Sequence, residues 1–120
     1  MATTYKVLGQ TGSSGSTGNG SQTLTATTAI NLYTVPAATS AVVSTITICN
    51  QASSAGTYRI AIRPSGATLA TQHYVAYGAT VNANDTVTLT LGMTLATTDI
   101  VTVYASASTM SFTAFGSEIA

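Results

Sequence analysis

Two segments of the chain alternate almost strictly between apolar and polar residues, and this alternation constrains the fold more than any other feature of the sequence. In Thr57–Arg63, a tyrosine and two isoleucines occupy every second position, and the polar positions include Arg59 and Arg63. In Thr86–Leu91, Thr alternates with Val or Leu throughout. A period of two is typical of a β-strand with one buried face, because successive side chains point to opposite sides. We therefore expect both segments to be strands, with the two arginines on an outer face.

Turn residues separate these segments from further strand-like segments. Pro64–Gly66 and Asn82–Asp85 are the clearest turns, and their spacing is typical of an all-β sandwich or barrel. The remaining strands are expected within Thr3–Leu8, Leu24–Val35, Ala41–Asn50, His73–Tyr77, Asp99–Ala105 and Met110–Phe115. The sequence thus predicts an all-β chain without a helix. It should form a single antiparallel β-sandwich, jelly-roll-like or immunoglobulin-like, of about eight short strands with an extended N-terminal arm.

The strand expected at residues 41–50 is β-branched almost throughout, so its two faces are assigned by alternation alone. Strict alternation places Val42 on the same face as Ile46 and Ile48. Val43 is then expected on the opposite face, with Thr45, Thr47 and Cys49.

The first 22 residues differ in composition from the rest of the chain. Gly9–Gln22 is rich in Gly and Ser and contains no large apolar residue, as is typical of a flexible linker or a long loop. The sequence therefore predicts an N-terminal strand and Gly/Ser-rich arm at residues 1–22, followed by a β-sandwich domain at residues 23–120. A chain lacking residues 1–22 is expected to fold and to attach more weakly to its partner.

Charge is almost absent from this chain. Only 5% of the residues are charged, three Lys or Arg against three Asp or Glu, whereas about a quarter is usual. Because catalysis needs acids, bases or metal ligands close to one another, this inventory predicts a protein that is not an enzyme. The zero net charge gives no reason to expect a nucleic acid partner, and no apolar run reaches the roughly 18 residues of a membrane span. So neutral a surface favours a structural role within an assembly.

A few residues could be combined into a catalytic or metal site, but each has a simpler interpretation. His73 and Asp85 with one of the many serines could form a hydrolytic triad, yet the sequence has no nucleophile motif. Asn82, Asn84 and Asp85 resemble part of a calcium loop, but no further acid follows at ligand spacing, and such residues are common in turns. The single cysteine, Cys49, is expected to be a small core residue. The sequence thus predicts no catalytic, cofactor-binding or metal-binding residues and no cofactor.

Two other groups of residues leave alternatives open. Arg59 and Arg63 could pair with acids of a neighbouring subunit, or they could keep one sheet face hydrated. Four tyrosines could form a platform for a sugar ring, although packing is the favoured interpretation: Tyr58, Tyr74, Tyr77 and Tyr104. The threonine-rich strand faces are flat and uncharged, so two such surfaces could approach each other closely.

Stretches along nearly the whole chain carry a resemblance to a known family. They are Thr3–Gln10 (TTYKVLGQ), Leu32–Pro36 (LYTVP), Ser44–Asn50 (STITICN), Tyr58–Pro64 (YRIAIRP), His73–Tyr77 (HYVAY) and Phe115–Ile119 (FGSEI). Together they resemble short virion structural proteins of tailed bacteriophages, especially phages of cyanobacteria. The Gly/Ser-rich segment is the part least similar to that family.

The resemblance implies a virion component assembled in the host cytoplasm, and it assigns no catalytic residues. Within this class we expect a head decoration or cement protein that binds and stabilises the assembled capsid lattice. Its partners would be the major capsid protein or other virion proteins, together with further copies of itself, for example in a trimer. The alternatives are a neck, baseplate or tail-fibre component, and a receptor- or glycan-binding module on the virion. The absence of a visible secretory signal and the single cysteine agree with folding in a reducing cytosol.

Overall fold

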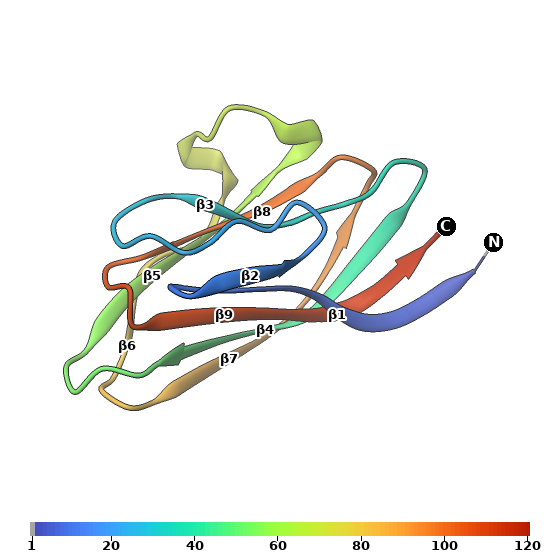
Figure 1. Ribbon diagram of the computed structural model, residues 1–120. Coiled ribbons are helices and arrows are strands. Elements are labelled where there is room, and N and C mark those ends of the chain that lie inside the picture. The colour runs from blue at the N-terminus through green and yellow to red at the C-terminus, as the bar shows by residue number, and fades with distance from the viewer. Residues whose placement is uncertain (1) are drawn as a thin grey trace.

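The computed structural model describes residues 2–120 and consists of two antiparallel β-sheets packed face to face (Figure 1). The strands are β1 (Thr3–Gly12), β2 (Gly15–Gly18), β3 (Ile30–Thr34), β4 (Ser40–Asn50), β5 (Gly56–Arg63), β6 (Tyr74–Val81), β7 (Thr86–Leu95), β8 (Ile100–Ala105) and β9 (Met110–Ile119). Two single 3-10 turns, Pro64–Gly66 and Thr71–His73, separate β5 from β6, and residues 2–120 contain no α-helix. The predicted all-β sandwich is confirmed.

The strand order decides between the two expected kinds of sandwich. One sheet has the order β2-β1-β9-β4-β7 and the other β3-β8-β5-β6, and we call them the five-stranded and the four-stranded sheet. Apart from the short hairpin strand β2, the chain crosses to the other sheet at every connection except the one between β5 and β6. This alternation is the strand order of a jelly roll.

The hydrophobic core lies between the two sheets and receives side chains from both. The largest fully buried side chains are Tyr33, Phe112, Leu8, Leu32, Ile46, Ile48, Ile60 and Met110. The inner face predicted for Thr57–Arg63 is confirmed at Tyr58 and Ile60, which are 4% and 0% exposed. Burial of each such side chain contributes about 1.5–3 kcal/mol, so this layer is the main source of stability.

The N-terminal segment is an integral part of the sandwich, which differs from the expected division into an arm at residues 1–22 and a domain at 23–120. Strand β1 lies between β2 and β9 and pairs with β9 from Thr3 to Thr11. Leu8 is completely buried in the core. The Gly/Ser-rich residues that follow form the end of β1, a hairpin turn and β2, and their small side chains suit this tight hairpin.

A β-bulge in the five-stranded sheet changes which side chains face the core. On β4 the register shifts between Val43 and Thr45, so Val43 is buried together with Ile46, and Val42 lies on the outer face. The prediction for Val42 and Val43 was therefore wrong, because one extra residue in a strand reverses the alternation beyond it. The same irregularity leaves Leu91 of β7 39% exposed, although the alternation predicts it inside.

We expect that deleting residues 1–22 abolishes cooperative folding. The deletion removes the strand between β2 and β9, takes Leu8 out of the core and exposes one edge of β9. Circular dichroism and two-dimensional NMR of the truncated chain measure this directly. A well-dispersed spectrum with a sharp urea transition would contradict the integral position of β1.

Strand β9 comes unusually close to its neighbour β4 at Gly116. A Cβ atom added at Gly116 would overlap the carbonyl oxygen of Val42, whereas one added at Gly12 would meet the Ser111 side chain at an ordinary 3.7 Å. Gly116→Ala is expected to lower the free energy of unfolding by about 1–3 kcal/mol, since backbone atoms must shift. Gly12→Ala is the matched control and should change it by less than about 0.5 kcal/mol. Equal effects in urea denaturation would contradict the close contact.

Candidate functional site

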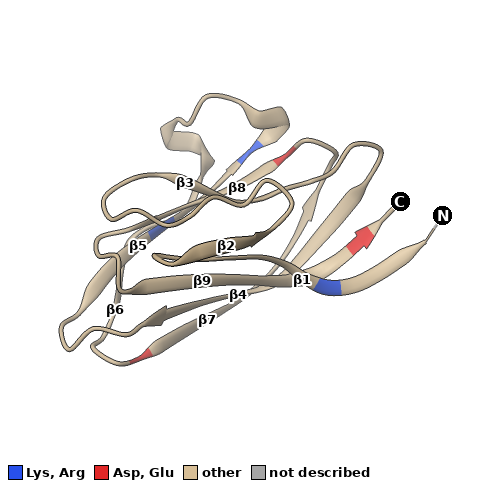
Figure 2. Cartoon of the chain, in the orientation of Figure 1, with Lys and Arg blue, Asp and Glu red and all other residues tan. Residues whose placement is uncertain are grey.

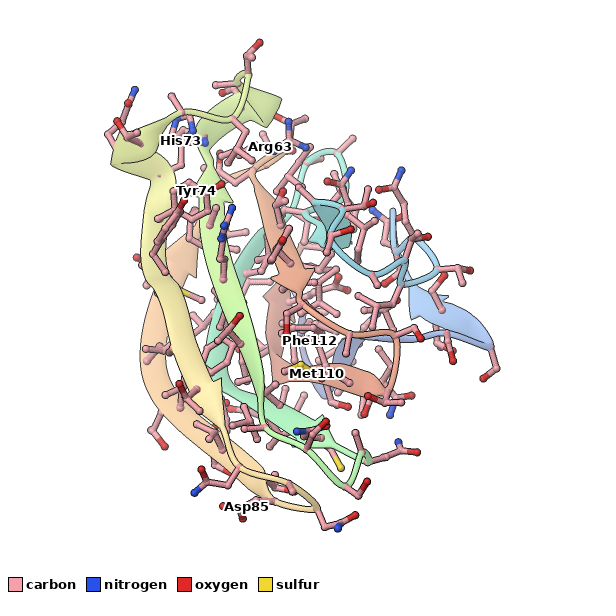
Figure 3. The ribbon with its side chains drawn as sticks, turned by 90° about the vertical axis from the view of Figure 1, so that its left-hand side faces the viewer. Arg63, His73, Tyr74, Asp85, Met110 and Phe112 are labelled. Atoms are coloured by element: carbon pink, nitrogen blue, oxygen red, sulfur yellow. The ribbon has the colours of Figure 1, made fainter. Side chains whose placement is uncertain are left out.

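The structure does not bring together the residues considered for a catalytic triad. His73 belongs to the second 3-10 turn, where its Nδ1 accepts a hydrogen bond of 3.0 Å from the Ala70 backbone N–H. Asp85 lies in the turn between β6 and β7, and Figure 3 shows the two residues at opposite ends of the sandwich. The histidine therefore has a local structural role in the described fold.

The residues considered for calcium binding form a turn, as the alternative interpretation predicted. Asn84 has a left-handed backbone, with φ of 52°, and Asp85 accepts a hydrogen bond of 2.8 Å from the Thr86 backbone N–H. Within residues 2–120, no three His, Cys, Asp or Glu side chains group together as metal ligands. Cys49 is half-buried on the outer face of β4, where it pairs with Ser111 and Thr86, and not in the core as expected.

The first and last strands carry the one ion pair found among the described residues. Lys6 Nζ lies 2.9 Å from Glu118 Oε1, and the buried Tyr33 hydroxyl donates a hydrogen bond of 2.6 Å to Glu118 Oε2. Burial alone would raise the pKa of Glu118, but the hydrogen bonds from Tyr33 and Lys6 and the charge of Lys6 outweigh it and hold the pKa below its ordinary 4.5. Burial and the same carboxylate raise the pKa of the Tyr33 hydroxyl far above 10.0. The trio is a structural link between the two sheets.

Arg63 donates hydrogen bonds through all three of its guanidinium nitrogens on the outer face of the four-stranded sheet. Its Nε donates to Thr102 Oγ1 at 3.0 Å and one terminal nitrogen donates to Asn31 Oδ1 at 2.9 Å. The other terminal nitrogen donates to the Ala67 carbonyl at 3.1 Å. These bonds join β3, β8 and β5 with the loop after the first 3-10 turn, so Arg63 stabilises the fold.

Arg59 lies on the same outer face in a different environment. Its guanidinium carbon is 4.2 Å from the centre of the Tyr77 ring and 4.2 Å from the centre of the Tyr104 ring. Because β5 lies between β8 and β6, the two rings cover the guanidinium from opposite sides. Tyr74 packs against Tyr77 edge-on, with ring centres 4.9 Å apart. This group, which we call the Arg59 cluster, comprises Arg59, Tyr74, Tyr77 and Tyr104.

The sequence named these residues without showing that they meet. Tyr58 belongs to the core and is absent from the cluster, since it points inward from β5. The other three tyrosines come together with Arg59 through the pairing of β5 with β8 and with β6. No spacing along the chain encodes that pairing, so the cluster could not be predicted from local pattern.

The outer face of the five-stranded sheet is a second candidate surface, which we call the neutral face. One row of paired residues crosses all five strands through Thr17, Gln10, Thr113, Thr47 and Thr88. By this register, none of the charged side chains in residues 2–120 points outward from this sheet. In Figure 2 the charged positions on this sheet are one basic residue within β1 and one acidic residue near the end of β9, whereas both arginines lie on β5.

The neutral face also exposes apolar side chains near the chain termini. Tyr5, Val7 and Phe115 are 83%, 42% and 39% exposed, and they lie on the adjacent strands β1 and β9. A shallow hollow of about 620 Å³ is lined by Tyr5, Val42, Phe115 and their neighbours, among them Lys6, whose charge is paired with that of Glu118. Exposed aromatic residues on a sheet face without outward-pointing charges are typical of a surface that another protein covers.

A further hollow of about 610 Å³ lies beside the β1–β2 turn and residues 108–113. Gly, Ser, Thr and Gln residues make up most of its lining, and no titratable side chain reaches it. Its chemistry does not single out a ligand.

Comparison with known proteins adds no family assignment: no protein-family model and no curated protein matches this sequence. None of the helical turns in residues 2–120 is long and apolar enough to cross a membrane. The two outer faces are therefore the candidates on which a functional interpretation rests.

The depressed pKa of Glu118 leads to a prediction of pH dependence. The carboxylate loses a proton more readily in the folded than in the unfolded chain, so its stabilisation is complete above about pH 4.5 and is lost as the pH falls through the lower folded value. Glu118→Gln should lower the free energy of unfolding at pH 7 by about 1–3 kcal/mol. The difference in free energy of unfolding between the variant and the wild type should become smaller below pH 4.5.

Asp85→Asn is the matched control, because Asp85 is exposed and forms no ion pair within the described part of the chain. Its urea denaturation curves should follow the wild type at each pH. A gap for Glu118→Gln that stays constant down to pH 2 would contradict the depressed pKa.

Proposed function

We propose that the protein is a non-enzymatic structural component of a phage virion, a head decoration or cement protein that binds the assembled capsid lattice. The observation that carries this proposal is the neutral face, whose outward-pointing strand side chains carry no charge and which exposes apolar surface around Tyr5 and Phe115. The resemblance to virion structural proteins and the jelly-roll strand order, which is common in viral shells, support it.

A neutral face suits attachment to a lattice for a physical reason. Burying an unpaired charge at an interface costs several kcal/mol, whereas threonine hydroxyls and small apolar groups are desolvated at little cost. Each contact of this kind is modest. A ligand that binds only the assembled state stabilises it by mass action, and many copies per particle multiply the effect.

The partners in this proposal are the major capsid protein or other virion proteins, together with further copies of the chain in a homo-oligomer such as a trimer. The site of action is the virion. A neck, baseplate or tail-fibre position uses the same surface chemistry and differs in copy number.

Copy number in purified particles tests the proposal. Quantitative mass spectrometry against the major shell protein should find hundreds of copies in a simple ratio, in tailless heads as well as in whole particles. A few to a few dozen copies would move the protein to the neck, baseplate or fibres. Its complete absence from particles would overturn the virion role.

A pair of threonine variants tests which face attaches. Thr88 and Thr80 are both exposed, and they lie on β7 and β6, the edge strands of the five-stranded and the four-stranded sheet. The assay measures binding of the purified protein to capsid shells from which it has been removed. Thr88→Lys should reduce the number of copies bound by about tenfold or more, because it places an unpaired charge in the interface. Thr80→Lys should leave this number unchanged. The reverse result would assign attachment to the four-stranded sheet.

A further inference from the structure

Aromatic rings cover the two faces of the planar Arg59 guanidinium, but its edge, which carries the N–H donors, is open. Tyr77 and Tyr104 cover the guanidinium on both sides, each at 4.2 Å. None of the guanidinium N–H groups of Arg59 donates to an acceptor in residues 2–120, whereas the Arg63 guanidinium donates to Thr102, Asn31 and Ala67. No buried polar side-chain atom lacks a partner in the described chain, so the donors of Arg59 reach solvent.

This geometry selects one class of ligand. A guanidinium with stacked faces can bind only in its own plane, where its paired N–H groups match the two oxygens of a carboxylate. The rings also fix the side chain before any ligand arrives, which reduces the entropy lost on binding. The three acids of the chain do not fill the site. Glu118 binds Lys6 and Tyr33, Asp99 accepts from the backbone N–H groups of Ser65 and Ala96, and Asp85 accepts from that of Thr86.

We propose that the Arg59 cluster binds a carboxylated saccharide, with the uronic-acid carboxylate in the plane of the Arg59 guanidinium. The surroundings favour a sugar over an acidic protein side chain. Tyr77 and Val75 of β6 are 63% and 53% exposed, and they offer apolar surface to the C–H groups of a sugar ring beside the charge. The tyrosine hydroxyl groups add donors and acceptors for sugar hydroxyls.

The position of the cluster in the sandwich agrees with this ligand. The Arg59 cluster and the neutral face lie on the outer sides of opposite sheets. If the neutral face is attached to a shell, the cluster points away from the particle, toward a bacterial surface. Only this argument about orientation rests on the proposed function; the site itself rests on the geometry of Arg59.

The test uses the isolated full-length chain and defined oligosaccharides. The sequence contains only two arginines, so a two-dimensional ¹⁵N NMR spectrum shows two Nε–Hε signals, and Arg63 serves as the internal reference. Tetragalacturonate should shift the Arg59 signal and leave the Arg63 signal in place. Maltotetraose, an uncharged four-sugar probe, and tetraglutamate, which carries carboxylates on a peptide, should bind at least about tenfold more weakly.

Two variants distinguish bidentate hydrogen bonding by Arg59 from non-specific attraction of the anionic sugar to positive charge. Arg59→Lys keeps the charge and loses the planar pair of donors, so it should weaken tetragalacturonate binding by about tenfold or more. Lys6→Gln removes one charge from the five-stranded sheet and should change binding by less than about twofold.

Several outcomes would overturn the proposal. An unmoved Arg59 signal would exclude the site, and equal binding of maltotetraose would remove the role of the carboxylate. Equal binding of tetraglutamate would identify an acidic protein partner, and an equal loss in Lys6→Gln would indicate unspecific attraction. These measurements need no virion. A negative result would therefore overturn the saccharide site without bearing on the proposed virion role, which copy number in particles tests.

Discussion

The placement of β9 between β1 and β4 is the constraint on which the rest of the structure depends. This last strand pairs with the first along almost its whole length, and the two chain ends meet through a pair of hydrogen bonds of 2.9 Å between Ala2 and Ala120. The pairing brings Leu8 and Phe112 into one core and aligns Tyr5, Val7 and Phe115 on one outer face. Both the stability of the sandwich and the continuity of the neutral face follow from a contact between residues more than a hundred positions apart.

The sequence predicts local alternation well and long-range placement poorly. For Thr57–Arg63, alternation alone predicts the buried face correctly, because Tyr58 and Ile60 both point into the core from β5. The assignment of Val42 and Val43 failed, because one extra residue near Ser44 reverses the faces and leaves no mark in composition. The Gly/Ser-rich segment has the composition of an arm but the structure of a hairpin, for a related reason. Small residues suit a hairpin that packs closely against its neighbours as well as they suit a linker, and only the partner strand distinguishes the two cases.

The candidate surfaces show the same limit. The sequence singles out Arg59, Arg63 and the tyrosines and leaves open whether these side chains bind a ligand or pack. Strand register separates them: Tyr58 enters the core, Arg63 joins a hydrogen-bond network, and Arg59 lies between two rings from neighbouring strands. A cross-strand cluster depends on which strands are adjacent, and adjacency is a property of the whole fold.

The few charged residues of the chain are arranged differently on the two sheets. On the five-stranded sheet, Lys6 and Glu118 neutralise each other at the end of the strands, and the outer face is left without charge. On the four-stranded sheet, Arg63 donates three hydrogen bonds to neutral acceptors, and Arg59 is held between aromatic rings with its donors open to solvent. A neutral side approaches another protein surface without desolvating ions, whereas a pre-oriented cation on the other side attracts an anion. The two proposals therefore assign different partners to opposite faces, so that neither partner would block the other.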